Sequence, residues 1–213
     1  MIERTRIKIC GIKEPEHARV AFEAGADAIG LVFWRESPRH VSVARAKKVA
    51  KSLPPFVTPV GLFVNAKAAE IRAILEEIPL GLLQFQGDEP ADFCAKFGVP
   101  YVRAVRMEKG VDLVECARRF SGAKALLVDA HVPGQRGGTG QVFDWAELPS
   151  KHPVPLILSG GLTAENVGRA IREVRPWAVD VSSGVESSRG VKDPAKIVEF
   201  IRSVQREDAG QSA

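Results

Sequence analysis

The chain has 213 residues, of which 45% are hydrophobic and 26% are charged, a composition typical of a folded domain with an apolar core. Its formal net charge is +4 and its basic residues are scattered, which argues against a nucleic-acid-binding face. The longest apolar run, AIGLVFW, is far shorter than the about 20 residues of a membrane helix. The three cysteines form no paired motif, and the first residues contain no apolar signal segment. These features predict a cytoplasmic protein that binds neither nucleic acid nor a membrane.

Short runs of aliphatic and β-branched residues recur along the chain, and each is followed by a helical pattern, in places after a loop. The eight runs cover residues 6–10, 28–33, 58–64, 81–87, 101–107, 125–130, 154–161 and 178–184. Strands that alternate with helices are typical of parallel βαβ units. Eight such units predict an α/β fold, a single-domain (β/α)8 barrel over residues 1–205, with a doubly wound sheet as the alternative. Residues 206–213 are expected to form a frayed tail.

Capping and glycine signals mark the segments between these strands. A helix is expected over residues 42–52, another from Asn65, which is a plausible N-cap, and the last from Asp193. The segment VPGQRGGTGQVFDW, residues 132–145, is too long and too rich in glycine for a simple connector. It predicts a mobile lid after the sixth strand.

Side chains at the carboxyl ends of the strands determine the chemistry of a (β/α)8 barrel, because the active sites of this fold lie there. Successive residues of a strand point to opposite faces. In the first strand we therefore expect Ile7 and Ile9 to face the helices, while Lys8 and Cys10 face the barrel interior.

The same alternation turns polar side chains of the sixth and eighth strands inward, namely Asp129, Asp180 and Ser182. Taken alone, Cys10 is either core filler or a reactive thiol, and Asp129 is either a turn cap or a functional carboxylate. A thiol and a carboxylate that enter one mouth from two strands have the layout of a general base and a general acid. Lys8, one layer below, is a cation that can lower the pKa of the thiol.

The loops after three strands carry signals for binding anions. SGGLTAEN (159–166) and DVSSGVE (180–186) place glycines and free backbone N–H groups after the seventh and eighth strands. This pair of loops is the recurring phosphate site of (β/α)8 barrels. Arg39 follows a Ser-Pro turn in FWRESPRH (33–40) and is either a surface arginine or a fork for a carboxylate.

Eight motifs, in this order, resemble those of the phosphoribosylanthranilate isomerase family over essentially the whole chain. They are KICGI (8–12), GLVFWRESPRHVS (30–42), GLFVN (61–65), LLQFQGDE (82–89), LLVDA (126–130), GGTGQVFDW (137–145), LSGGLTAENV (158–167) and DVSSGVE (180–186). Any one of them is only suggestive, whereas all eight in sequence are highly specific.

The resemblance implies a (β/α)8 barrel without cofactor or metal that acts on a small-molecule phosphosugar. Its reaction is the Amadori rearrangement of N-(5′-phosphoribosyl)anthranilate in tryptophan biosynthesis. Cys10 is similar to the base that removes the C2′ proton, and Asp129 to the acid that protonates the furanose ring oxygen. Arg39, Gln84 and Asp180 are expected to bind the substrate, with Arg39 on the anthranilate carboxylate. The phosphate is expected at four residues: Gly160, Gly161, Ser183 and Gly184.

One position departs from the family pattern, which often reads Gln-x-His-Gly after the fourth strand. Here Gln86 replaces that histidine, and an amide cannot titrate near neutrality. Three alternative functions remain: the related histidine-pathway isomerase, a metal-dependent phosphosugar epimerase, and a non-catalytic phosphosugar-binding barrel. Cys10 argues against the first, which resembles a barrel with aspartate at that position. The sequence does not indicate an oligomeric state.

Overall fold

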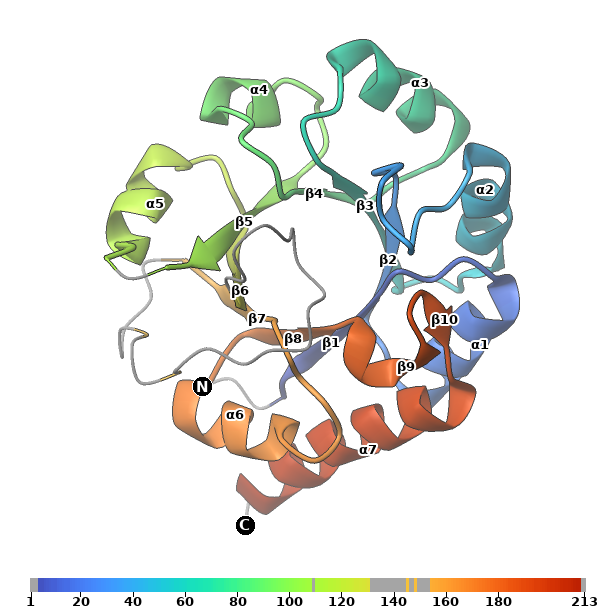
Figure 1. Ribbon diagram of the computed structural model, residues 1–213, viewed down its shortest axis with the longest axis vertical. Helices are drawn as coiled ribbons and strands as arrows, with labels where there is room; N and C mark the ends of the chain where they lie inside the picture. The colour runs from blue at the N-terminus through green and yellow to red at the C-terminus, as the bar shows by residue number, and fades with distance from the viewer. Residues whose placement is uncertain (1–3, 109, 131–144, 146–147, 149–153, 212–213) are drawn as a thin grey trace.

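Eight parallel strands close into a barrel in the computed structural model, which describes residues 4–108, 110–130, 145, 148 and 154–211 (Figure 1). The strands are β1 Arg6–Cys10, β2 Ala28–Val32, β3 Thr58–Phe63, β4 Leu82–Phe85, β5 Tyr101–Met107, β6 Ala125–Ala130, β7 Leu156–Leu158 and β8 Ala178–Val181. Each strand pairs with the next, and β1 also pairs with β8, where Lys8 lies in register with Asp180. This closure confirms the predicted barrel and excludes an open, doubly wound sheet.

Helices surround the ring of strands (Figure 1). Those described are α1 Pro15–Ala24, α2 Val43–Ser52, α3 Ala68–Glu77, α4 Ala91–Ala95, α5 Leu113–Arg119, α6 Val167–Val174 and α7 Pro194–Gln211. A short hairpin, β9 Glu186–Ser188 and β10 Val191–Lys192, follows β8. Local signals start two of the helices, because Ser42 and Asp112 accept hydrogen bonds from the first-turn backbone of α2 and α5. Within the described part of the chain, no helix combines the length and apolar character needed to cross a membrane.

Alternation along the strands separates two apolar regions. Ile7, Ile9, Val128 and Val179 belong to the large core that also contains buried helix residues. A smaller cluster is formed by the side chains of opposite parity: Val102, Ala104, Ala125, Leu127, Ile157 and Ala178. The expected facing of β1, β6 and β8 is therefore confirmed, with Lys8, Cys10, Asp129 and Asp180 turned into the barrel.

Asn65 does not cap α3 as expected, because Lys67 occupies that position. Asn65 has a left-handed backbone, with φ 51°, and its side chain binds the loop after β4 instead. Its Oδ1 accepts from the backbone N of Asp88 (2.7 Å), and its Nδ2 donates to the Asp88 carboxylate (3.1 Å). Asn65 thus ties the loop after β3 to the loop after β4. The segment expected as a lid, residues 132–145, lies outside the described residues apart from Trp145.

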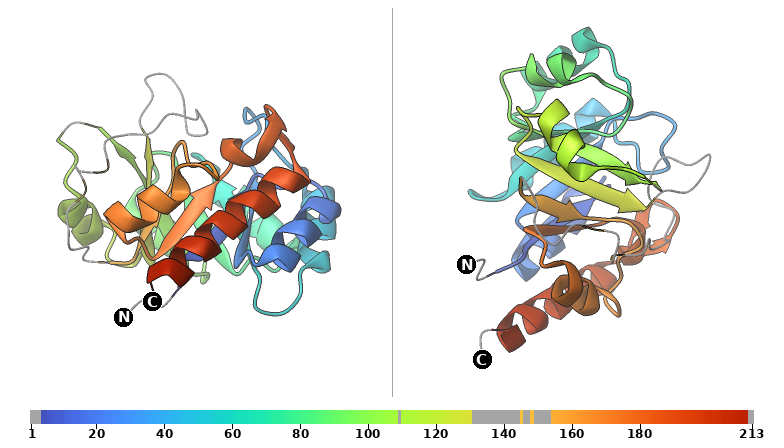
Figure 2. Two further views of the ribbon diagram at one scale, coloured as in Figure 1. Left: turned by 90° about the horizontal axis from the view of Figure 1, so that it is seen from below. Right: turned by 90° about the vertical axis from the view of Figure 1, so that its left-hand side faces the viewer.

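The C-terminal segment is helical rather than frayed, so the predicted boundary at residue 205 is wrong. α7 continues to Gln211 and lies between α1 and α6 (Figure 2). Asp208 accepts two hydrogen bonds from Thr5, at 2.8 Å from the backbone N and 2.7 Å from Oγ1. Glu207 forms an ion pair with Arg172 of α6. These contacts order the tail that sequence composition alone marks as loose, and residues 212–213 lie outside the description.

A chain ending after Gln205 is expected to lose at least about 2 kcal/mol of unfolding free energy, since Thr5 loses two hydrogen bonds to a carboxylate. A chain ending after Gln211 keeps these bonds and serves as the matched control. Urea unfolding followed by circular dichroism measures both. Equal midpoints for the two truncations would show that the end of α7 does not stabilise the barrel.

Candidate active site

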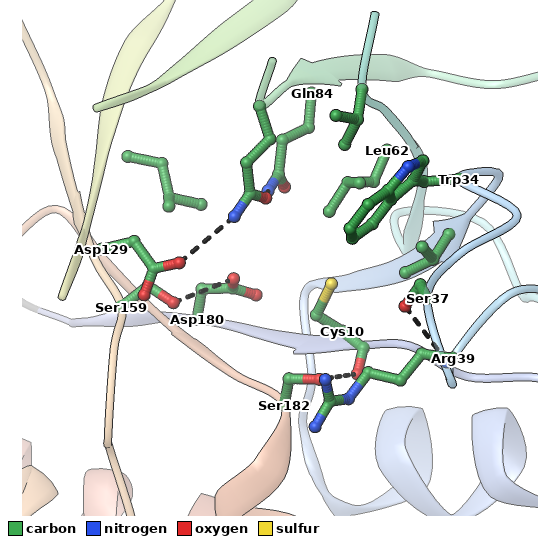
Figure 3. A pocket seen from close by; sticks show the side chains of 14 residues that line it. Cys10, Trp34, Ser37, Arg39, Leu62, Gln84, Asp129, Ser159, Asp180 and Ser182 are labelled. Carbon is green, nitrogen blue, oxygen red and sulfur yellow. Dashed lines mark hydrogen bonds between the residues drawn. The ribbon is translucent and has the colours of Figure 1, made fainter. Parts of the chain in front are cut away.

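A pocket opens at the carboxyl ends of the strands (Figure 3). Five of the residues expected in the site line it: Cys10, Arg39, Gln84, Asp129 and Asp180. The structure thus brings the thiol of β1 and the carboxylate of β6 into one cavity.

The pocket has an apolar wall and a polar wall. Cys10 packs with Val32 and Leu62 in a small cluster that Trp34 extends. The polar wall begins at Gln84, which lies beside Leu62 on the neighbouring strand, and includes Asp129 (Figure 3). Such a division fits a ligand with an aromatic part and a polyhydroxylated part.

A buried ion pair lies beside Cys10. Lys8 Nζ and Asp180 Oδ1 are 2.8 Å apart, and both side chains are almost fully buried. Gly30 on the neighbouring strand makes this cluster possible. A Cβ at that position would lie 2.8 Å from Cys10 Sγ and 3.1 Å from Lys8 Nζ. Only a residue without a side chain fits against both groups.

Opposing influences set the pKa of the Cys10 thiol. Burial raises it, the Lys8 and Lys192 cations lower it, and Asp180 raises it, leaving the pKa above its ordinary value. Burial also lowers the pKa of Lys8, but Asp180 and Cys10 raise it to about 12, so Lys8 remains charged. The thiolate of Cys10 therefore depends on a cation held in place by Asp180.

Two glutamines of β4 and its following loop lead to Asp129. Gln84 Nε2 donates to Gln86 Oε1 (3.0 Å), and Gln86 Nε2 donates to Asp129 Oδ2 (3.2 Å). Gln84 is 1% exposed, yet its Oε1 accepts no hydrogen bond from the described residues. An unpaired buried acceptor costs about 1–3 kcal/mol, so a ligand that donates a hydrogen bond to Gln84 Oε1 would gain affinity.

The buried carboxylate of Glu89 fixes the loop that carries Gln86. Glu89 accepts hydrogen bonds from the backbone N of Asn65 (2.6 Å), the backbone N of Gly87 (2.9 Å) and Arg103 Nη1 (2.9 Å). Arg103 also donates to the carbonyl of Gly87 (2.6 Å). These hydrogen bonds hold the loop in place, and the loop in turn orients the amide of Gln86 toward Asp129.

Arg39 is a pocket residue rather than a surface arginine, but part of its fork is already bound. Its Nε and Nη2 donate to the two carboxylate oxygens of Glu186, at 2.7 and 2.9 Å. Its backbone N donates to Ser37 Oγ (3.1 Å). The side-on edge of the guanidinium therefore binds a carboxylate of the protein itself.

The two glycine-rich loops border a second hollow that adjoins the pocket. Gly160, Gly161 and Ser183 line it, together with Asp129 and Asp180. The two glycines have φ angles of 83° and 66°, which side-chain-bearing residues rarely adopt. Among the described residues, none accepts a hydrogen bond from the backbone N–H of Gly160, Gly161 or Ser183. These donors remain for an anion.

Gly184 has a different role from the other three residues expected at the phosphate. Gly184 is not one of the described residues that line the hollow. A Cβ there would lie 1.9 Å from the carbonyl oxygen of Leu162. Gly184 thus lets the loop after β8 touch the loop after β7.

Several residues of the site were not identified from the sequence. Glu186 and Lys192 belong to the hairpin after β8, and Gln86 was noted only as a departure from the family pattern. Ser159 Oγ donates to Asp180 (3.3 Å), and Ser182 Oγ donates to the carbonyl of Cys10 (3.1 Å). Two features of the sequence could have identified some of these residues. They are the inward position of Ser182 on its strand and the glutamate of DVSSGVE, which is Glu186. Nothing local in the sequence indicates Lys192.

Replacing Lys8 with methionine is expected to raise the pKa of Cys10 further, since the Lys8 cation is lost and Asp180 remains. The pH dependence of alkylation by a small haloacetamide measures this in a chain whose other two cysteines are alanine. Lys51→Met, which removes an exposed lysine of α2, is the control. An unchanged alkylation profile in the Lys8 variant would contradict the assigned role of this cation.

Comparison with known proteins identifies the family. The protein-family model described as N-(5′-phosphoribosyl)anthranilate (PRA) isomerase matches residues 7–203 of this chain. A protein named N-(5′-phosphoribosyl)anthranilate isomerase from Leptothrix cholodnii is 55% identical over 206 residues, covering 97% of this chain and 93% of that protein.

Solved structures agree with this match. Phosphoribosyl anthranilate isomerase from Thermotoga maritima has a TM-score of 0.87 at 40% identity, over 95% of this chain and 99% of that chain. Phosphoribosyl anthranilate isomerase in complex with reduced 1-(o-carboxyphenylamino)-1-deoxyribulose 5-phosphate gives 0.80 at 36% identity, with the same coverage of 95% and 99%. By sequence and by fold, the chain belongs to the N-(5′-phosphoribosyl)anthranilate isomerase family.

Proposed function

We propose that this chain converts N-(5′-phosphoribosyl)anthranilate to 1-(2-carboxyphenylamino)-1-deoxyribulose 5-phosphate, a reaction of tryptophan biosynthesis. The observation that carries the proposal is the common pocket of Cys10 and Asp129, which adjoins a hollow rich in free backbone donors. The thiol and the carboxylate share one cavity and the anion donors lie beside it, which supports the roles of base, acid and phosphate site. The family relationship supports the same reaction.

The lining of the two cavities supports one arrangement of the substrate. Its aromatic ring packs on the apolar wall at Trp34 and Leu62, with its carboxylate at Arg39. Its phosphate accepts hydrogen bonds from the backbone of Gly160, Gly161 and Ser183, and the contact made by Gly184 keeps the two loops together.

The remaining polar lining surrounds the sugar. Asp180 lines both the pocket and the hollow, which places it beside the ribose. The unpaired Oε1 of Gln84 needs a donor, and neither a carboxylate nor a phosphate dianion supplies one. A ribose hydroxyl or the amine N–H of the substrate does, so Gln84 binds the central part of the molecule.

Ring opening comes first. Asp129 starts as a neutral carboxylic acid and transfers its proton to the furanose ring oxygen. The bond from C1′ to that oxygen then breaks, and the nitrogen lone pair forms a C1′=N Schiff base with positive charge on nitrogen. Asp129 ends the step as a carboxylate, which the amide N–H of Gln86 stabilises.

Proton abstraction follows on the open chain. The thiolate of Cys10 removes the proton from C2′, and the electron pair of that C–H bond forms a C1′=C2′ double bond as the iminium becomes a neutral amine. The resulting enolamine tautomerises to the 2-keto sugar, with a proton added at C1′. No atom is gained or lost overall. The charge on Lys8 stabilises the thiolate before the step.

The chemistry of the cysteines supports a cytoplasmic location. Cys10, Cys94 and Cys116 are all free thiols. A base that works as a thiolate needs to escape oxidation, and reducing conditions provide this. We therefore assign the enzyme to the cytoplasm, with a small phosphosugar as its partner rather than nucleic acid or membrane.

Cys10→Ala and Asp129→Asn are each expected to lower kcat by at least about 10²-fold, the usual contribution of a general base or acid. The loss of anthranilate fluorescence on adding freshly made substrate follows the reaction. Cys94→Ala is the matched control, because Cys94 is also buried but belongs to the outer core. Undiminished turnover by the Cys10 variant would reduce that residue to core packing. A wild type that turns over only the histidine-pathway substrate would refute the proposed function itself.

Gln84→Leu is expected to lower kcat/KM by about tenfold, since a buried acceptor for a substrate donor is removed. Leu82→Met changes a residue of the same strand and parity one layer deeper, and is expected to leave kcat/KM near the wild-type value. Steady-state kinetics with both variants measure the difference. If the leucine variant retains wild-type kcat/KM, the unpaired Oε1 does not contact the substrate.

A further inference from the structure

Glu186, on the hairpin after β8, is the centre of a buried charge cluster beside the pocket. Besides the two bonds from Arg39, it accepts from the backbone N of Gly190 (3.0 Å) and from Lys192 Nζ (2.9 Å). Lys192 also donates to the backbone carbonyl of Ser182 (2.8 Å). Both carboxylate oxygens are thus saturated by donors from two different loops.

The cluster leaves one nitrogen of Arg39 for a ligand. Nε and Nη2 are bound to Glu186, whereas Nη1 makes no hydrogen bond to the described residues. Arg39 lines the pocket and lies on its Cys10 side, opposite Gln84 (Figure 3). Nη1 therefore lies on the end-on edge of the guanidinium, which remains open to a second carboxylate.

Close packing restricts the position of Arg39. A Cβ at Gly11 would lie 2.9 Å from Arg39 Cδ, and one at Gly190 would lie 2.5 Å from the carbonyl oxygen of Pro38. Both glycines have positive φ angles, of 81° and 82°. The loop after β1 and the hairpin thus close against the segment that carries Arg39, and the side chain is held before any ligand arrives.

The charges of the cluster favour an anion in the pocket. Burial raises the pKa of Glu186, but the hydrogen bonds and charges of Arg39 and Lys192 lower it to about 2, so it stays ionised. Two cations then share a single carboxylate. Arg39 is the charged member of the cluster that lines the pocket, so the remaining positive charge reaches the pocket at this residue.

We propose that Glu186 is a positioning residue, which holds Arg39 by its side-on edge so that Nη1 is presented to the carboxylate of the substrate. Glu186 thereby confers the preference for an aromatic amine that carries an ortho carboxylate. This inference rests on the proposed role of Arg39 as the carboxylate-binding residue.

The test compares two ligands that differ only in the carboxylate. They are the reduced carboxyphenylamino deoxyribulose phosphate and its phenylamino counterpart, with both Kd values measured by calorimetry. In the wild type the carboxylate is expected to strengthen binding by at least about tenfold, as for a hydrogen bond between charged groups. In Glu186→Gln this preference is expected to fall to about twofold, with the Kd of the phenylamino ligand nearly unchanged. KM is expected to rise while kcat stays within about threefold.

Three further variants separate the possible outcomes. Glu89→Gln breaks a comparable buried ion pair, with Arg103, and is expected to keep the wild-type preference. Arg39→Met should abolish the preference, and if it does not, the role of Arg39 fails before that of Glu186 is tested. If Glu186→Gln does not fold, Glu186→Asp withdraws the carboxylate by one methylene and should lower the preference in the same direction.

The sign of the effect decides between positioning and competition. If Glu186 merely competes with the substrate for Arg39, removing its charge strengthens the preference for the carboxylate. If Glu186 has only a structural role, both ligands weaken equally. Either result overturns the proposal, provided that Arg39→Met has abolished the preference.

Discussion

The ion pair between Lys8 and Asp180 lies at the seam where β1 meets β8 and the barrel closes. Burying two charges costs several kcal/mol each, and an apolar pair of similar volume would close the seam at least as well. The pair is therefore poorly explained by stability. The pair lies beside the thiol of Cys10, and this position explains why it is present. It holds the Lys8 cation next to a thiol whose pKa is raised by burial. Gly30 makes room for this arrangement.

The rest of the site is built outward from that seam by loops that hold one another. Glu89 fixes the loop after β4, Glu186 joins the hairpin after β8 to Arg39, and Gly184 lets the two glycine-rich loops touch. The bridges of Glu89 and Gly184 join loops of neighbouring strands, whereas the bridge of Glu186 joins the hairpin after β8 to the loop after β2. The strands set the position of each side chain along the barrel axis, whereas the bridges set its orientation in the pocket.

Much of this was predictable from the sequence, because strand alternation and glycine placement are local properties. They placed Cys10 and Asp129 inside the barrel mouth. The bond from Arg39 to Glu186 was not predictable, since it joins residues 147 positions apart through loops whose conformations depend on one another. Asn65 and the end of α7 were misread for the same reason. Polar composition suggested a cap and a loose tail, but contacts with Asp88 and Thr5 determine both.

The amide of Gln86 has a consequence for the way this pocket responds to acidity. An amide carries a donor and an acceptor on the same group and keeps zero charge at every physiological pH. In this pocket its donor binds Asp129 and its acceptor binds Gln84, so the two partners hold the amide in one orientation. An imidazole at that position would instead gain its own charge near neutrality. With Gln84 and Gln86, β4 and the loop after it line the pocket with neutral amides, so the charge of this part of the lining does not change with pH.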